Sequence, residues 1–287
     1  MFYCILLTVL TGLCWTSYGI ILSFTARTKM DVILFGLVQN FCCMLLGIIF
    51  LAKWDHFNPA ETLNLIPFVL AAGGLNAIGQ FATKCAMSRG HNGLAWAISQ
   101  SAMIIPFTAG VLFFNQQSTI SQWLGVFLIL AGIIMPNLTR TRNSLSWLIL
   151  SLTAFLLFGT VQLLYLIPSL RNITDTANLR PVLASAGMII GWGAIAAASR
   201  HRFEFQKKTV IIGGAMSLIS ISSLLLFFVS LDKLSKLALG NIAVPIMIGS
   251  NIFAFTLFSI FTIREKNTWK EWSSTIAVLL GIICLAI

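Results

Sequence analysis

The chain has 287 residues, of which 58% are hydrophobic and only 9% are charged. Soluble domains carry about 25% charged residues, so the composition excludes disorder, coiled coil and collagen and argues against a soluble enzyme fold. The formal net charge is +10, but the basic residues lie in short segments between apolar stretches. This pattern indicates loops that face anionic lipid and cytoplasm, and it does not predict a nucleic-acid partner.

Ten apolar stretches follow one another along the chain, each close to the roughly 20 residues that a membrane span needs. They cover residues 2–25, 30–52, 65–87, 92–114, 120–138, 145–168, 177–198, 209–231, 237–262 and 271–287. The chain is therefore predicted to be an all-α polytopic membrane protein with ten transmembrane helices. The first stretch has no basic n-region and is longer than an h-region, so we expect a helix and not a signal peptide.

The sequence contains an internal repeat. Residues 122–134 align without gaps on 271–283, and glycine or aromatic positions also correspond between the first and sixth stretches and between the third and eighth. Five helices per half is an odd number, so the second half would enter the membrane from the opposite side, as in many secondary carriers. We predict a first repeat at 1–138, a linker at 139–144 and a second repeat at 145–287. The alternative is a duplication that only built a larger bundle.

Basic residues are unequally divided between the two sets of loops. The loops after helices 1, 3, 5, 7 and 9 hold thirteen of them, and the loops after helices 2, 4, 6 and 8 hold five. The positive-inside rule then places both termini outside. The membrane is expected to be the inner membrane of a bacterial cell.

All eight acidic residues lie in loops or at the ends of predicted helices. A cation or proton needs a carboxylate partner inside the membrane, so the pattern argues against a cationic substrate and against carboxylate-based proton coupling. Neutral or anionic polar solutes remain. Lys84, four residues after Gln80, has two interpretations: a side chain that snorkels to the surface, or a cationic site for a substrate carboxylate or phosphate.

Amides and aromatic rings inside the predicted spans are the candidate substrate contacts. A single buried amide can join two helices, but a set of them predicts a hydrogen-bonding cavity. A ring can pack in the core or stack against the apolar face of a sugar or base. The residues of these types are Trp15, Tyr18, Gln39, Asn40, Asn76, Gln80, Trp96, Gln100, Asn241 and Asn251.

Prolines interrupt two helices that correspond in the repeat. Pro106 lies in the fourth stretch and Pro245 in the ninth. A proline inside a span removes a backbone hydrogen bond and frees carbonyl groups toward a cavity, so the two breaks mark the predicted binding region. Gly187 and Gly191 form a G-x-x-x-G pattern, which predicts close helix packing.

Catalytic and cofactor motifs are missing from the sequence, which has no H-E-x-x-H, no G-x-S-x-G and no phosphate-binding glycine loop. His56, His91 and His201 are isolated in loops and are expected to be solvated, and the six cysteines have no C-x-x-C spacing. We predict no enzyme activity, no cofactor and no metal site.

The ten short spans in two halves resemble the drug/metabolite transporter superfamily, and its EamA-like members in particular. The segment 264–268, Arg-Glu-Lys-Asn-Thr, is similar to the acidic-basic-x-Thr turn of that superfamily, whereas 115–119 lacks those charges. The segment 89–101 looks more like the sugar-porter branches, of glucose/ribose and rhamnose type, than like the amino-acid exporters.

The resemblance implies a central cavity lined by helices 1–4 and 6–9, with helices 5 and 10 set apart at a homodimer seam. It also implies termini inside, which is opposite to the loop count. Carried over to this chain, it favours as substrate-binding residues Trp15, Tyr18, Gln39, Asn40, Asn76, Gln80, Trp96, Gln100, Gln162, Tyr165 and Asn251.

We therefore predict a secondary active or facilitative transporter in the lipid bilayer. Its substrate would be a small polar metabolite, uncharged or anionic and first of all a sugar, moved by alternating access. Two alternatives stay open: an exporter of amino acids or other metabolites on the same scaffold, and a non-transporting membrane enzyme or assembly subunit.

Overall fold

The computed structural model describes residues 1–27, 30–51, 59–89, 92–134, 145–171, 173, 176–203, 205–258 and 269–287. Its α-helices are α1 (Phe2–Arg27), α2 (Val32–Phe50), α3 (Pro59–Arg89), α4 (Asn92–Gln100), α5 (Ile104–Phe113), α6 (Ile120–Ile134), α7 (Leu145–Leu170), α8 (Arg180–Ala198), α9 (Lys207–Ser235), α10 (Ala243–Phe258) and α11 (Trp269–Ala286). Two short 3-10 helices, η2 (Ser101–Met103) and η4 (Gly240–Ile242), precede α5 and α10.

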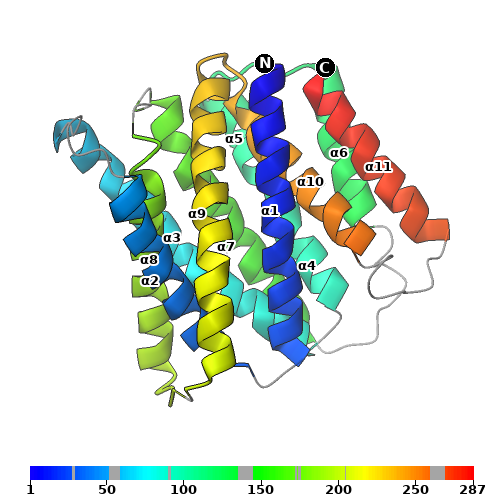
Figure 1. The fold of residues 1–287 in the computed structure, drawn as a ribbon. Helices are drawn as coiled ribbons and strands as arrows, with labels where there is room; N and C mark the ends of the chain where they lie inside the picture. Colours follow the sequence, from blue (N-terminus) through cyan, green and yellow to red (C-terminus); the bar gives the residue numbers. More distant parts are fainter. Residues whose placement is uncertain are drawn as a thin grey trace.

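These helices make ten spans, because α4, η2 and α5 run on as one, and η4 continues into α10. Six of the helices (α1, α2, α3, α7, α8 and α9) are long and apolar enough to cross a membrane, and four shorter apolar helices complete the set. The prediction of an all-helical protein with ten membrane helices is confirmed. The two termini lie at the same end of the bundle (Figure 1), as an even number of spans requires.

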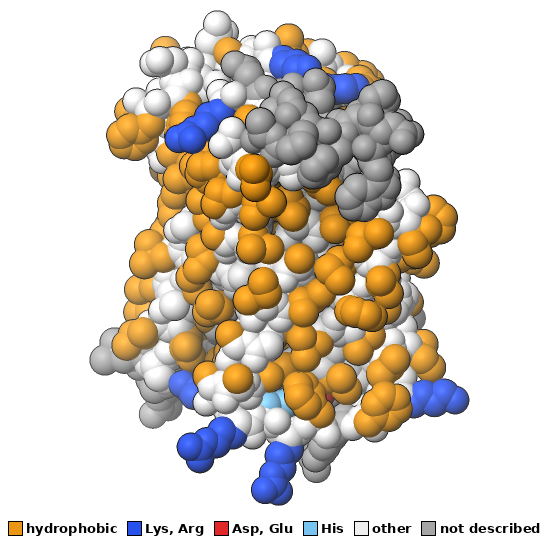
Figure 2. All heavy atoms as spheres, turned by 90° about the vertical axis from the view of Figure 1, so that its left-hand side faces the viewer, with side chains coloured by type: hydrophobic (Ala, Val, Ile, Leu, Met, Phe, Trp, Pro, Cys, Tyr) orange, Lys and Arg blue, Asp and Glu red, His pale blue; other side chains and the backbone are white. Residues whose placement is uncertain are grey.

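The surface is that of an integral membrane protein. Large apolar side chains such as Phe113, Ile120 and Phe127 are well exposed. On the face seen in Figure 2, apolar side chains cover the middle of the molecule, and Lys and Arg lie at its two ends. An apolar belt of this extent would be unstable in water and is matched by the hydrocarbon core of a bilayer.

The helix contacts repeat after five spans. α3 packs against α7 and α8, and α9 packs against α1 and α2. Likewise α1 packs against α10, while α7 packs against α4 and α5, and α6 packs against α11 (Figure 1). If each span is replaced by the span five places away in the sequence, these contacts are exchanged in pairs. The contact between α6 and α11 maps onto itself. This pattern supports the division into repeats at 1–138 and 145–287, which remains a prediction.

Glycines set the closest of these crossings. A Cβ on Gly73 of α3 would meet the Ala184 carbonyl oxygen of α8, and a Cβ on Gly187 would meet the Leu70 carbonyl oxygen. Gly191 lies against Gly74 in the same way, so the predicted packing role of the G-x-x-x-G pattern is confirmed. The α3 and α8 backbones therefore touch, and both helices reach the centre of the bundle.

A second glycine crossing joins α6 to α11. A Cβ on Gly125 or on Gly281 would lie 2.7 Å from the carbonyl oxygen of the other glycine. The small-residue faces of these two helices are therefore used within the chain. Their outer faces carry exposed apolar side chains, and the homodimer through helices 5 and 10 stays a prediction.

A buried ion pair joins α8 to α9 at the end of the bundle that holds the termini. Arg180 Nη1 lies 2.8 Å from Asp232 Oδ1, and the Arg180 side chain is fully buried. The Ser169 hydroxyl donates to Asp232 Oδ1 (2.6 Å) and accepts from Arg180 Nη1 (2.7 Å). The sequence placed both charges in loops or at helix ends, and the structure has Arg180 at the start of α8 and Asp232 in the last turn of α9. Both side chains are nevertheless buried, and only their mutual pairing makes this burial tolerable.

At the opposite end, Asp31 joins α2 to the end of α8. Its Oδ1 accepts from the backbone N–H groups of Ile33 and Leu34, which caps α2, and its Oδ2 lies 2.8 Å from His201 Nε2. The expectation that His201 is merely solvated is therefore wrong. His56 and His91 lie outside the described residues.

The contact between α3 and α8 can be tested with paired glycine substitutions. Gly187→Ala should lower the stability by about 1–3 kcal/mol, because the added methyl group meets backbone atoms that cannot move aside. Gly193→Ala on the same helix adds its methyl group where nothing lies within 4 Å, so it should be neutral or slightly stabilising. Thermal unfolding in detergent measures both, and equal melting temperatures would contradict the close approach.

Candidate functional site

A pocket lies at mid-depth in the bundle, and eight helices contribute residues to it. It holds about 820 Å³ of empty space, counted out to the solvent at its mouth. Its lining consists of Cys14, Trp15, Ser17, Tyr18, Gln39, Asn40, Asn76, Gln80, Trp96, Gln100, Phe158, Val161, Gln162, Met188, Met216, Ile219, Ser220, Ser223, Leu224 and Asn251. None of these described lining residues carries a charged side chain. The pocket therefore combines amides, hydroxyls and rings with apolar contacts, as small-molecule sites do.

Ten of the eleven predicted substrate-binding residues line this pocket. The exception is Tyr165, which is 1% exposed and packs edge-on against the rings of Phe227 and Phe228, with centroids 6.4 and 5.2 Å away. Tyr165 lies almost one turn beyond Gln162, toward the end that holds the termini. It belongs to the apolar core and does not line the pocket, which corrects its assignment from the family resemblance.

Sequence reasoning missed the part of the lining that α8 and α9 supply. Ser220 and Ser223 line the pocket, together with the apolar Met188, Met216 and Leu224. The signal that could have found the serines is their spacing of three residues in an apolar span. That signal is weak, because a serine in a helix can also bond to its own backbone, as Ser223 does to the Ser220 carbonyl oxygen.

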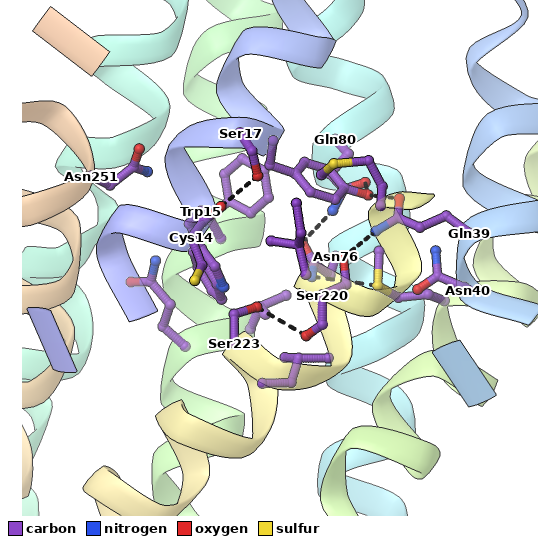
Figure 3. A pocket seen from close by; sticks show the side chains of 18 of the residues that line it. Cys14, Trp15, Ser17, Gln39, Asn40, Asn76, Gln80, Ser220, Ser223 and Asn251 are labelled. Atoms are coloured by element: carbon purple, nitrogen blue, oxygen red, sulfur yellow. Dashed lines mark hydrogen bonds between the residues drawn. The ribbon is translucent and has the colours of Figure 1, made fainter. Parts of the chain in front are cut away.

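One wall of the pocket is a connected hydrogen-bond network. The Tyr18 hydroxyl lies 2.7 Å from Gln39 Oε1 and 3.1 Å from Gln80 Oε1. Gln39 Nε2 donates to Ser220 Oγ (2.5 Å), and Gln80 Nε2 donates to Asn76 Oδ1 (3.4 Å). Figure 3 shows Gln39, Gln80 and Ser220 of this network meeting from α2, α3 and α9, and Tyr18 joins them from α1. The network fixes the polar groups of this wall in place.

A second set of lining residues, Asn251, Gln162 and Trp96, has polar atoms without partners, and we call this set the second wall. Neither amide atom of Asn251 has a hydrogen-bond partner, and the same is true of Gln162 Oε1 and Trp96 Nε1. In Figure 3, Asn251 lies across the pocket from Gln39 and Asn40. These three residues come from α10, α7 and α4, so the two walls belong to different sets of helices.

Buried aromatic residues seal the pocket toward the end that holds the termini. Trp15, in the lining, lies 6.0 Å from the Phe227 ring, and Phe227 packs on Phe228. Phe228 in turn lies under the Arg180 guanidinium, at 5.6 Å. The buried ion pair thus lies beyond an aromatic layer and does not face the pocket.

Of the two predicted proline breaks, the structure has the one at Pro106 but not the one at Pro245. Pro106 lies in the first turn of α5, directly after η2, and η2 follows the lining residue Gln100, so the fourth span does change geometry beside the pocket. Pro245 lies in the first turn of α10, where its missing N–H would have had no helical partner. It therefore interrupts nothing, and neither proline lines the pocket.

Lys84 lies on α3 and is half-buried. It is absent from the residues that line the pocket. The Lys84 ammonium group is therefore not part of the pocket. This favours the interpretation of Lys84 as a side chain that snorkels to the membrane surface over that of a cationic substrate site.

Comparison with known proteins gives the family. Residues 2–138 match the EamA-like transporter family. This match covers the first half of the chain and agrees with the predicted EamA-like resemblance. The members of that family are transporters and not enzymes, which agrees with the prediction of a transporter. The match does not support a particular sugar branch. The resembling turn at 264–268 lies outside the described residues.

A solved structure described only as "Crystal structure of protein" has the same fold as this chain. It aligns with a TM-score of 0.68 over 99% of this chain and 98% of that chain, at 12% sequence identity. At this identity the likeness shows the fold alone, and it extends that fold to the second half. None of the curated proteins compared with the chain matches it.

Proposed function

We propose that the protein is a secondary carrier that moves a small polar metabolite, uncharged or anionic, across the membrane by alternating access. The observation that carries this proposal is the pocket at mid-depth, whose described lining combines amides, hydroxyls and rings without a charged side chain. Polar groups in the middle of a membrane protein are costly and mark solute pathways. A packed bundle with no solute to move would fill this space with aliphatic side chains.

Two features support alternating access. The helix contacts map onto themselves after five spans, as expected for two halves of opposite topology that rock about a central site. The aromatic layer of Tyr165, Phe227 and Phe228 is completely buried, so this conformation is closed toward the end that holds the termini. Transport would require this layer to part and a matching seal to form at the other end.

A sugar is the first candidate substrate. Trp15 and Trp96 place rings among the amides of the pocket, and a ring that stacks on the apolar face of a sugar while amides bond its hydroxyls is a common way to bind it. An amino acid is the second candidate. The described lining offers no charged partner for a carboxylate or an ammonium group, which favours the sugar.

We propose that both termini face away from the cytoplasm. Among the described residues, the end opposite the termini carries Arg89, Arg200, Arg202, Lys207 and Lys208, whereas the terminal end carries Arg171, Lys233 and Lys236 on its surface. Arg180 no longer counts as a loop charge, since it is buried and paired. The inner membrane of a bacterial cell would then present the more basic end to the cytoplasm.

A pair of C-terminal reporter fusions tests this orientation. Alkaline phosphatase, which is active only outside the cytoplasm, should be active on the C-terminus, and green fluorescent protein in the same place should be dark. The opposite pattern would place both termini inside, as the family resemblance implies.

The transport proposal is tested in liposomes loaded with an equimolar mixture of neutral, anionic and cationic metabolites, with mass spectrometry of what leaves. Uncharged or anionic solutes should leave in a protein-dependent way without ATP. Gln100→Leu should slow that flux about tenfold, because one hydrogen bond of about 1.4 kcal/mol is lost from the pocket, and should leave the melting temperature nearly unchanged.

The matched control is Gln122→Leu, the same change on α6 outside the pocket. Gln122 Oε1 accepts from the Thr119 backbone N–H at the start of the helix, so this variant should melt earlier and transport normally. If no solute leaves the liposomes, the proposed function is wrong. If Gln100→Leu unfolds the protein, Gln100 is a packing residue.

A further inference from the structure

We propose that the substrate is a neutral molecule bearing neighbouring hydroxyl groups or a carboxamide, and that Asn251, Gln162 and Trp96 make its polar contacts. The Tyr18–Gln39–Gln80 network is then a fixed wall that shapes the pocket. This inference rests on the proposed function. It adds the class of the substrate and the pocket residues that bind its polar groups.

The first step is the difference between the two walls. Tyr18, Gln39 and Gln80 use their polar atoms on one another and on Ser220. Asn251 is 1% exposed and uses neither of its amide atoms. Folded proteins keep few buried polar groups unpaired, because each costs free energy. Single unpaired atoms also occur in the packed core, as at the Tyr165 hydroxyl, but Asn251, Gln162 and Trp96 lie together at one pocket. Their grouping there indicates hydrogen bonds that form only when a solute is bound.

The second step is that the unpaired groups are held in place. The Thr16 hydroxyl bonds to the Asn251 carbonyl oxygen (3.2 Å), and Gly12 lets α1 touch α10 at Met247 and Ser250. The Trp96 ring packs over Gly19, where a Cβ would lie 3.1 Å from Cζ2. The backbone at Asn251 and the ring of Trp96 are therefore held by contacts with α1, so these two residues present their free atoms at fixed places.

The third step is charge. The described lining has no charged side chain, Lys84 is not part of it, and Arg180 and Asp232 neutralise each other beyond the aromatic layer. A charged solute would lose its hydration in this pocket and gain no opposite charge. The pocket therefore selects against free carboxylates, phosphates and amines.

The fourth step is the pattern of donors and acceptors. Asn251 offers an N–H donor beside a carbonyl acceptor, Trp96 offers a donor only, and Gln162 Oε1 offers an acceptor. A partner must both donate and accept at neighbouring positions. Vicinal hydroxyls and carboxamides do this without charge, whereas ethers, ketones and quaternary amines do not.

The charge class is tested with matched solutes in the same liposomes: D-glucose, myo-inositol and nicotinamide against D-glucosamine and D-glucuronate. The neutral compounds should leave in a protein-dependent way, and the two charged analogues at less than a tenth of that rate. Flux of the charged analogues alone would overturn this inference and leave the carrier intact. No flux of any solute would instead contradict the proposed function.

The role of the wall formed by Asn251, Gln162 and Trp96 is tested with Asn251→Leu and Gln162→Leu. Each should slow the flux of the neutral solute about tenfold or more, while the melting temperature stays the same or rises, because an unpaired buried polar group has been removed. Gln39→Leu is the matched control on the other wall, and it should lower the melting temperature because it removes the hydrogen bonds of Gln39 to Ser220 and Tyr18. Unchanged flux in Asn251→Leu, or a lower melting temperature in that variant, would overturn the inference.

Discussion

Inside a bilayer a polar group must find its partner within the protein, and this constraint orders the whole molecule. The backbone meets it by forming helices throughout the described spans. Arg180 and Asp232 meet it by pairing with each other and with Ser169, and the Tyr18–Gln39–Gln80 wall meets it by a network. Among the residues that line the pocket, Asn251, Gln162 and Trp96 keep buried polar atoms without a partner. These atoms are the ones in the pocket that are suited to a solute.

The pocket exists because glycines bring some helices together while larger side chains hold others apart. Gly73 and Gly187 let the α3 and α8 backbones touch, and Gly12 does the same for α1 and α10. At the same depth, the amides and rings on the inner faces of these helices keep the centre open. Toward the end that holds the termini, Phe227 and Phe228 close the centre again. Tight crossings and an open middle are thus two results of one pattern of residue sizes.

Much of this could be predicted from the sequence, because the strongest signals in a membrane protein are local. Apolar runs gave the ten spans, and amides inside those runs gave most of the pocket, since lipid leaves a polar side chain few places other than the interior. The pairing of Arg180 with Asp232 could not be predicted, because it joins residues 52 positions apart. Tyr165 and Pro245 were misplaced because spacing within one helix does not say how deep its neighbours reach.

The central claim is that a pocket in the middle of the membrane is open to water and polar solutes. The reactivity of the native cysteines measures this access directly. Cys14 lines the pocket, and Cys43 lies in the packed core with no exposed surface. In single-cysteine variants, a small hydrophilic methanethiosulfonate should modify Cys14 rapidly, should do so more slowly in the presence of a transported solute, and should leave Cys43 unmodified. A Cys14 as inert as Cys43 would contradict the account.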